Sequence, residues 1–114
     1  MATHRSSLKL IQGTVDILIL KTLTQGPHHG YGISAWIRSR TDGDLGIEDA
    51  ALYQALHRLE RRELVISEWG LSDNNRRAKF YEITPKGRHQ LLEESATWQR
   101  YARAVFTVLE TASE

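Results

Sequence analysis

The chain of 114 residues contains no cysteine, so it can form neither disulfide bonds nor thiolate metal ligands. It also lacks a long apolar run, and its N-terminus does not join a basic segment to an apolar one. Neither a membrane span nor a signal peptide is therefore indicated. From these absences we expect a cytoplasmic protein with no membrane partner.

Signs of enzyme chemistry are missing as well. The sequence shows no nucleophile and base at a recognisable spacing, no glycine-rich phosphate loop and no paired buried carboxylates. Its five histidines include the neighbours His28 and His29, but adjacent side chains point apart on most backbones, and no two histidines stand four residues apart. We therefore expect no catalytic residue, no cofactor and no bound metal.

The composition is that of a small globular protein. The chain has a mass of 13.0 kDa and is 40% hydrophobic and 25% charged, so it has enough apolar surface to form a core. Its net charge of +1 does not by itself predict a nucleic-acid partner, because a binding face depends on where the charges lie. The basic residues have to be located along the chain.

The first half of the chain is predicted to be helical. Apolar residues at three- and four-residue spacing predict a first helix that starts at Leu8 and is ended by Gly26-Pro27. A second helix should run from Gly30 to about Thr41. The break that follows contains glycines and acids, and it predicts a turn with a brief strand around residues 45–47.

A third helix, from about Ala50 to Arg62, carries the first functional signal. Asp49 is placed to cap it, because a carboxylate can accept hydrogen bonds from the free amides of the first turn. At about 100° per residue the leucines share one side, while the opposite side is rich in donors and has no acid. The residues on or near that outer side are Ala50, Gln54, His57, Arg58 and Arg61. A plain solvated surface would look the same, so the neighbouring segments decide.

A β-hairpin is predicted next, because two alternating segments, Glu63–Gly70 and Ala78–Thr84, enclose a run of turn-forming residues. Three helices and a hairpin in this order are typical of a winged helix-turn-helix. In that fold the third helix enters the DNA major groove and the hairpin, or wing, reaches the flanking backbone or minor groove. The residues expected to bind DNA from the wing are Asn74, Asn75, Arg76, Arg77 and Lys79.

A long last helix is predicted from the cap Thr84 and from Pro85, which suits the first helical position, to about Glu110. It carries a coiled-coil-like seam of Leu91, Ser95, Trp98, Ala102, Val105 and Leu109. A small domain cannot cover so long a helix, so a second copy should cover it. The other half of this interface is expected on the first helix, through Leu8, Ile11, Val15 and Leu18.

The chain is thus expected to consist of a DNA-binding unit, residues 1–84, and a dimerisation helix, residues 85–114. Two-fold pairing would place the two third helices about one DNA turn apart, on a palindromic operator.

Four blocks of sequence, in this order and spacing, resemble the PadR family of bacterial transcriptional regulators: GTVDILILKTL (13–23), GPHHGYGI (26–33), LYQALHRLE (52–60) and NNRRAKFYEITPKGR (74–88). The short form with a single C-terminal helix is the better match, and the hairpin is similar to an acidobacterial-type subgroup. The resemblance implies a homodimeric DNA-binding protein, usually a repressor, released from its operator by small molecules such as phenolic acids. It also implies DNA-binding roles for Tyr31, Tyr53 and Arg58, which match positions in the family's motifs.

The chain departs from the family pattern around its third helix. Ala50-Ala51 replaces the glycine and hydroxyl residue common in the family, so backbone amides near Ala51 would have to bind the phosphate. Gln54 replaces a proline, and its amide can pair with adenine; Glu63 replaces a glycine. We expect the operator to differ from those of relatives.

Trp98 is also a candidate to line an effector pocket. In some PadR relatives flat aromatic compounds bind between aromatic side chains of the two subunits, and here the small Ser95 and Ala102 flank the indole. Interlocking packing at the seam is the alternative role for this ring.

The expected fold is therefore α+β and mainly α, a winged helix-turn-helix with a long C-terminal dimerisation helix. The expected function is sequence-specific regulation of transcription, with double-stranded DNA and a second copy as partners and a small aromatic effector as a candidate ligand. The main alternative is a winged helix that binds proteins, which would favour an apolar or acidic outer side on the third helix. An RNA-binding protein would favour stacking aromatics on a wider sheet.

Overall fold

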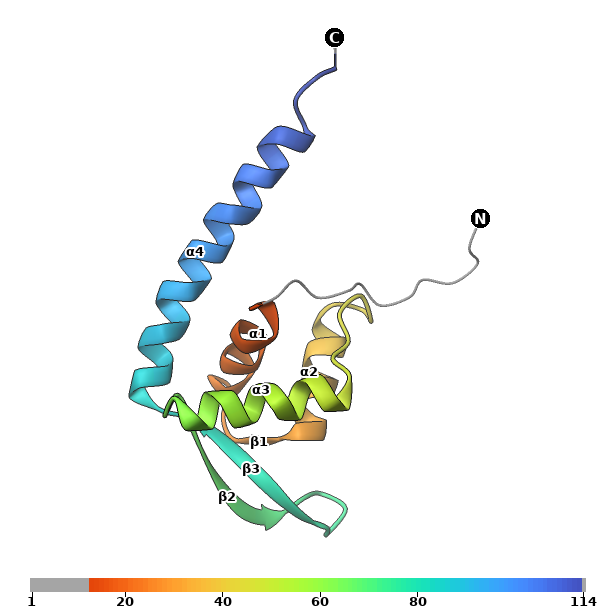
Figure 1. Ribbon diagram of the computed structural model, residues 1–114. Helices are drawn as coiled ribbons and strands as arrows, with labels where there is room; N and C mark the ends of the chain where they lie inside the picture. Colours follow the sequence, from red (N-terminus) through yellow and green to blue (C-terminus); the bar gives the residue numbers. More distant parts are fainter. Residues whose placement is uncertain (1–12, 114) are drawn as a thin grey trace.

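A computed structural model describes residues 13–113. It confirms an α+β, mainly helical winged helix-turn-helix that continues into a long C-terminal helix (Figure 1). The helices are α1 (Thr14–Leu23), α2 (Gly30–Arg40), α3 (Asp49–Arg61) and α4 (Pro85–Leu109), and the strands are β1 (His28–His29), β2 (Val65–Leu71) and β3 (Arg77–Ile83). The expected start of the first helix at Leu8, together with Ile11, lies outside the described residues.

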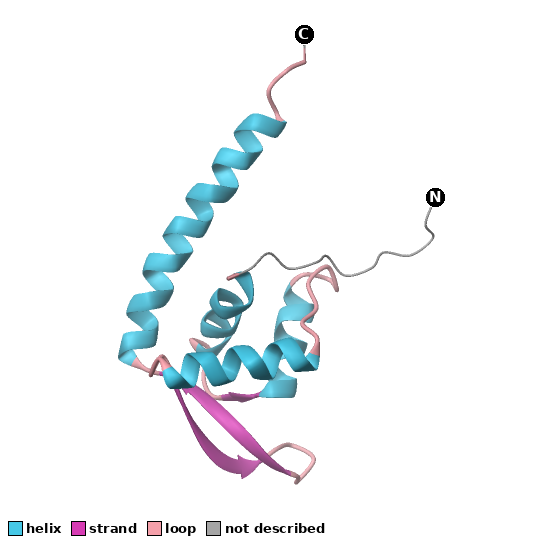
Figure 2. Cartoon of the chain, in the orientation of Figure 1, coloured by secondary structure: helices cyan, strands magenta, loops and turns pink. Residues whose placement is uncertain are grey.

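The three N-terminal helices pack together on one side of a small antiparallel sheet (Figure 2). The strand order is β1-β3-β2, and the hairpin register runs from Val65 opposite Ile83 to Leu71 opposite Arg77. The hairpin projects away from the body at the end opposite the free end of α4 (Figure 1). The wing and the long helix therefore reach out from the body in opposite directions.

The prediction of a brief strand around residues 45–47 is wrong, because no strand forms between α2 and α3. Leu45 makes only bridge-type pairing, and its amide is held by the Oγ1 atom of Thr41 at 3.0 Å, so this loop turns back onto the end of α2. The third strand is instead β1, where His28 pairs with Tyr81 and His29 with Phe80. Two polar residues give no alternating apolar pattern, which is why the sequence did not reveal this strand.

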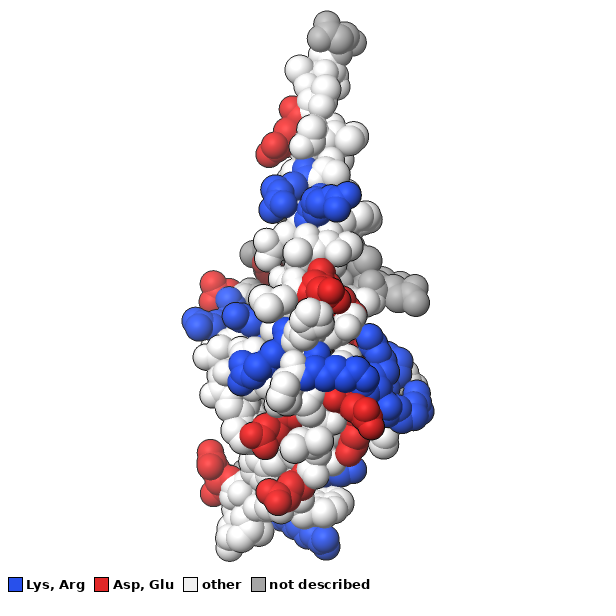
Figure 3. All heavy atoms as spheres, turned by 90° about the vertical axis from the view of Figure 1, so that its left-hand side faces the viewer, with Lys and Arg blue, Asp and Glu red and all other residues white. Residues whose placement is uncertain are grey.

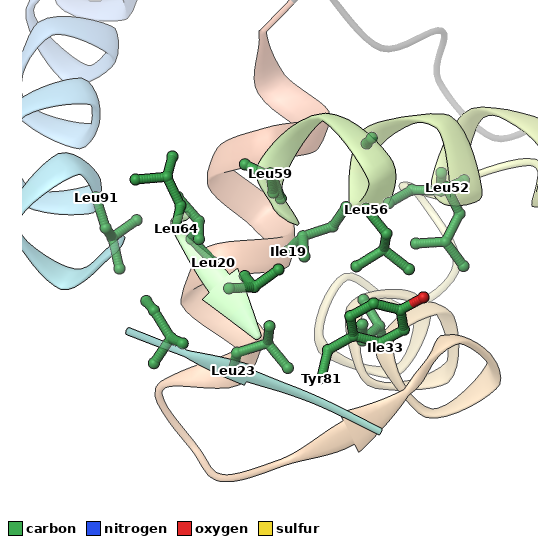
Figure 4. Close-up of a cluster of buried hydrophobic side chains, with 14 of the residues drawn as sticks. Ile19, Leu20, Leu23, Ile33, Leu52, Leu56, Leu59, Leu64, Tyr81 and Leu91 are labelled. Carbon is green, nitrogen blue, oxygen red and sulfur yellow. The ribbon is translucent and has the colours of Figure 1, made fainter. Parts of the chain in front are cut away.

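The core lies between the three helices and the sheet (Figure 4). Its fully buried members from α1 and α3 are Ile19, Leu20, Leu23, Leu52, Ala55, Leu56 and Leu59. Tyr81 reaches the same cluster from β3, and Leu91 reaches it from α4 with only 8% of its surface exposed. Leu91 was expected on the dimer seam, but the subunit itself already covers it.

The ends of α3 differ from expectation in one respect. Asp49 is not the N-cap: the helix is preceded by Glu48, which makes no side-chain capping bond, and Asp49 is the first helical residue, where its charge still suits the helix dipole. At the other end Glu63 adopts a left-handed backbone with φ of 63°. The Leu64 amide bonds to the Leu59 carbonyl at 2.9 Å, closing the helix in the manner that usually employs glycine.

The start of α4 is fixed against the junction of α3 and β2. Thr84 is its N-cap, as expected: the Oγ1 atom accepts from the Gly87 amide at 2.9 Å and donates to the Glu63 carbonyl at 2.8 Å. A Cβ atom on Gly87 would lie 2.1 Å from the Leu64 carbonyl oxygen, so only glycine permits this close approach. The direction of α4 is therefore set by contacts with the junction of α3 and β2.

Candidate nucleic-acid interface

An open hollow of about 1180 Å³ lies between the start of α2, the outer side of α3 and the β2–β3 hairpin. It brings together residues that are far apart in the sequence, among them Tyr31, Tyr53, His57, Asn74, Arg76, Arg77 and Lys79. Asp73 is the one acidic residue among those that line the hollow. The hollow is a concave surface that donates hydrogen bonds and carries positive charge.

The tip of the hairpin is a short loop that presents its donors to solvent. The Ser72 amide bonds to the Arg76 carbonyl at 2.8 Å, and the Asn75 amide bonds back to the Ser72 carbonyl at 2.8 Å. Asn75 has φ of 61°, a conformation that asparagine tolerates better than most residues. Asn74, Asn75 and Arg76 are therefore exposed on a loop that is ordered by its own backbone.

The three wing cations stand in different surroundings. Arg76 is exposed at the tip and forms no ion pair within residues 13–113. The guanidinium of Arg77 lies 4.5 Å from the centre of the Trp69 ring, and the Nζ atom of Lys79 lies 4.0 Å from a Glu60 carboxylate oxygen. Besides Asp73, which lines the same hollow, Glu60 of α3 is thus an acid that faces these cations.

Glu60 links α3 to the two strands of the wing. One carboxylate oxygen accepts from the Ser67 hydroxyl of β2 at 2.7 Å, and the other faces Lys79 of β3. The neighbouring Tyr81 phenol has a raised pKa, mainly because it is buried and secondly because of the Glu60 charge. A single acid therefore contacts both strands of the hairpin and fixes them against α3.

The outer row of α3 consists of Ala50, Gln54, His57 and Arg61, all exposed. Ala51 is exposed beside this row. Tyr53 borders the hollow with 45% of its surface exposed, and its phenol packs so tightly on the start of α2 that a Cβ atom on Gly30 would lie 2.5 Å from the Tyr53 oxygen. The helix presents an outer side that is neither apolar nor acidic.

Arg58 has a partner that the sequence did not reveal. Its guanidinium donates to the Asp16 carboxylate of α1 at 2.7 Å; the Arg58 side chain is 47% exposed and that of Asp16 only 12%. Arg58 is not among the residues that line the hollow. Its direct contact in the free protein therefore joins α3 to α1, and the pairing was invisible because the two residues are 42 positions apart.

The start of α2 forms the far rim of the hollow. Tyr31 is 76% exposed there, and the helix is capped by the Nδ1 atom of His29, which accepts from the Gly32 amide at 2.9 Å. The Nδ1 atom of His28 lies 2.7 Å from the Gly26 carbonyl. The two histidines serve the turn and the helix cap, and residues 13–113 contain no group of three His, Asp or Glu side chains that could hold a metal.

The long helix α4 leaves most of its apolar residues uncovered. Trp98 is 37% exposed, and its Nε1 atom donates to the Thr14 hydroxyl of α1 at 3.2 Å. Further exposed apolar residues on α4 are Leu92, Tyr101, Val105, Phe106, Val108 and Leu109. Figure 3 views this side of the molecule: acidic and basic side chains intermingle over the body, and much of α4 is uncharged. Val15 and Leu18 of α1 are half-buried.

Comparison with known proteins identifies the family. The sequence profile of the transcriptional regulator PadR-like family matches residues 19–93, which include α2, α3 and the whole hairpin. The chain belongs to the PadR-like family of transcriptional regulators. It is therefore a DNA-binding regulator and not an enzyme.

Individual relatives agree with this assignment. A transcriptional regulator from Clostridium thermocellum is 33% identical with a TM-score of 0.77, over 85% of this chain and 94% of its own. A PadR family transcriptional regulator from Eggerthella lenta is 34% identical with a TM-score of 0.69, over 89% and 86% of the two chains. An uncharacterised protein of Lysinibacillus sphaericus is 32% identical over 89% of this chain and 93% of its own. No helix within residues 13–113 is long and apolar enough to cross a membrane.

Proposed function

We propose that this PadR-like protein is a homodimeric repressor that binds a palindromic operator and is released from it by a small aromatic effector. The hollow carries this proposal, because it joins Tyr53 and His57 of α3 to the basic hairpin in one concave surface. Gln54 and Arg61 are exposed on the same helix but do not line the hollow. A duplex fits such a surface when a helix occupies the major groove and a two-stranded wing lies on the adjacent backbone.

Sequence reading is assigned to the outer row of α3. Gln54, His57 and Arg61 are exposed and point away from the core, so each can reach a base edge: the amide can pair with adenine and the guanidinium with guanine. The exposed Ala51 leaves the backbone amides at the start of α3 open to a phosphate. Arg58 can join them only by leaving Asp16.

Positioning on the DNA backbone is assigned to the rim of the hollow. Arg76 and Arg77 present guanidinium groups at the wing, and Lys79 lies behind them. Asn74 and Asn75 supply neutral donors at the tip, where short side chains allow a close approach to the minor groove. Across the hollow, the phenols of Tyr31 and Tyr53 are placed to donate to phosphates.

The second copy is assigned to the apolar side of α4. This helix of 25 residues is about 38 Å long at about 1.5 Å per residue, and beyond its first turns the subunit leaves it uncovered. Ser95, Trp98, Ala102, Val105 and Leu109 follow one side of it. Val15 and Leu18 are half-buried on α1, the helix that contacts α4. An exposed apolar surface of this extent in a regulator is typical of an interface between subunits.

The effector is assigned to the surroundings of Trp98. The indole is 37% exposed although its NH group bonds to Thr14 at 3.2 Å, so part of the residue remains available at the seam. Ser95 and Ala102 are half-buried on the adjacent turns, and their small side chains leave room beside the ring. A flat aromatic compound between two such indoles would change how the subunits pair, and with them the spacing of the two α3 helices.

The test is the salt dependence of DNA binding. An operator is selected from a random pool of duplexes, and the dissociation constant is measured over a range of salt concentrations for the wild type and for Arg76→Ala/Arg77→Ala. Each lost phosphate contact should lower the slope of log affinity against log salt by about 0.9, hence by about 1.8 for the pair. Arg100→Ala/Arg103→Ala on α4 is the matched control, because it removes the same charge far from the hairpin. An unchanged slope in the wing variant, or an equal loss in the control, removes the wing from the mechanism.

A further inference from the structure

Trp69 is an exposed aromatic residue on β2, a strand in which Val65 alone is buried in the core. Residues of β2 alternate between two faces, and Val65 on the same face as Trp69 is 1% exposed. Trp69 and Leu71 lie further out along this face, where they are 57% and 66% exposed. The core ends at Val65, so the fold does not require a large aromatic ring at position 69.

The ring is covered on one side by a cation of the neighbouring strand. The Arg77 guanidinium stacks over it with 4.5 Å between the guanidinium carbon and the ring centre, and Lys79 is the residue directly opposite Trp69 in the register. Trp69, Leu71 and both cations line the hollow between the hairpin and α3. An exposed arginine side chain usually samples many rotamers, and stacking on a flat ring restricts it to a few.

We propose that Trp69 is a positioning residue that holds the Arg77 guanidinium for a phosphate of the DNA backbone. This rests on the proposed function, because it deepens the role of the wing in DNA binding. Stacking uses the flat face of the guanidinium. Its N–H groups point outward in the plane of the guanidinium, where they can pair with two phosphate oxygens at once.

The position of Trp69 on the hairpin indicates that the contact is to the DNA backbone and not to the bases. When α3 occupies the major groove and the hairpin tip the neighbouring minor groove, the sugar–phosphate strand that separates the two grooves passes over the hollow between them. The indole is flat, and its single donor cannot distinguish base pairs, so the residue that contacts the DNA is Arg77 and the contact is to a phosphate. The contact should therefore strengthen binding to every DNA sequence alike.

The variants that test this are Trp69→Ala, Trp69→Phe, Arg77→Ala and the double variant Trp69→Ala/Arg77→Ala. Ile66→Ala is the matched control, because Ile66 is 56% exposed on the opposite face of the same strand. Each protein is titrated with a random-sequence duplex and with the selected operator over a range of salt concentrations. A thermal unfolding curve of each variant verifies that it is folded.

Trp69→Ala should weaken binding to both duplexes about three- to tenfold and lower the salt slope by about 0.9, the value for one phosphate contact, although it removes no charge. Trp69→Phe should keep most of the slope, Ile66→Ala all of it, and the double variant should be no worse than Arg77→Ala alone.

Three results would overturn the inference while leaving the proposed function intact, namely wild-type affinity in Trp69→Ala, a normal salt slope in Trp69→Ala, or losses that add in the double variant. A loss of slope in Ile66→Ala would also overturn it, since the effect would then belong to the hairpin as a whole. A wild-type protein that selects no duplex and shows no salt-dependent binding would instead contradict the proposed function.

Discussion

Arg58→Ala should lower the free energy of unfolding by about 1–2 kcal/mol and should change DNA affinity little. The Asp16 side chain is only 12% exposed, so the variant leaves a nearly buried carboxylate without its charged donor, at a cost of about 1–3 kcal/mol. Asp16 lies in the first turn of α1, where the helix dipole offsets about 0.3–1 kcal/mol of that cost. The expected loss of unfolding free energy therefore lies in the lower half of that range of about 1–3 kcal/mol.

Asp16→Asn is the informative comparison for this pair. Its amide oxygen can still accept from Arg58, and no carboxylate is left behind, so the loss should stay within about 0.2–1 kcal/mol, the range for an exposed pair. The Arg58 side chain is 47% exposed, which supports that range. Denaturant unfolding of both variants measures the difference, and a loss of about 1 kcal/mol also corresponds to a few degrees in Tm.

The competing role for Arg58 gives the opposite result. If Arg58 leaves Asp16 to pair with a guanine, Arg58→Ala should reduce affinity for the selected operator by about ten- to a hundredfold or slightly more, and affinity for random DNA far less. Unchanged stability together with such a selective loss would refute the assignment of Arg58 as a link between α1 and α3.

Three further predictions concern the backbone and the dimer. Gly87→Ala should destabilise the protein by about 1–3 kcal/mol in thermal unfolding, because its Cβ atom would lie 2.1 Å from the Leu64 carbonyl oxygen; a neutral result would mean that α4 is free to shift. Glu63→Gly should stabilise it by about 1 kcal/mol by relieving the left-handed backbone with φ of 63°, and a loss of stability would contradict that source of strain. Trp98→Ala should weaken the dimer by about 3–5 kcal/mol in sedimentation if the ring is packed at the seam. If the ring lines a pocket, the variant should stay dimeric but lose effector-induced release from DNA, and a monomeric variant that still responds to the effector would contradict both roles.

Periodicity predicted the elements that bury a continuous apolar face. The leucines of α3, the alternating residues of the hairpin and the cap at Thr84 each carry a local signal, and α2, α3, α4, β2 and β3 lie within a few residues of expectation. The strand β1 was missed because its two histidines, which pair with β3, give no alternating apolar pattern. Asp49 was misplaced as a cap because cap and first-turn positions favour the same acids.

The candidate interface was predictable in its outline but not in its internal contacts. The outward row of α3 follows from helical geometry, and the wing donors follow from a cluster in one loop. Two sets of contacts join separate elements: Arg58 pairs with Asp16, and Glu60 contacts Ser67 and Lys79. Because these residues lie in different helices and strands, no spacing along the chain predicts their contacts. The exposure of Trp69 beside Arg77 depends on where the core ends along β2, and the alternation of the strand does not show that point.

The measurement that tests the central claim most directly is a hydroxyl-radical footprint of the wild-type protein on a duplex selected from a random pool. The account predicts two half-sites related by two-fold symmetry, with centres about 34–36 Å apart, or one helical turn. Each half-site should show backbone protection beside the major groove, and Arg76→Ala/Arg77→Ala should lose only the outer, wing-side protection. Failure to select any sequence, or a single protected site without symmetry, would contradict a dimeric regulator that reads DNA through α3.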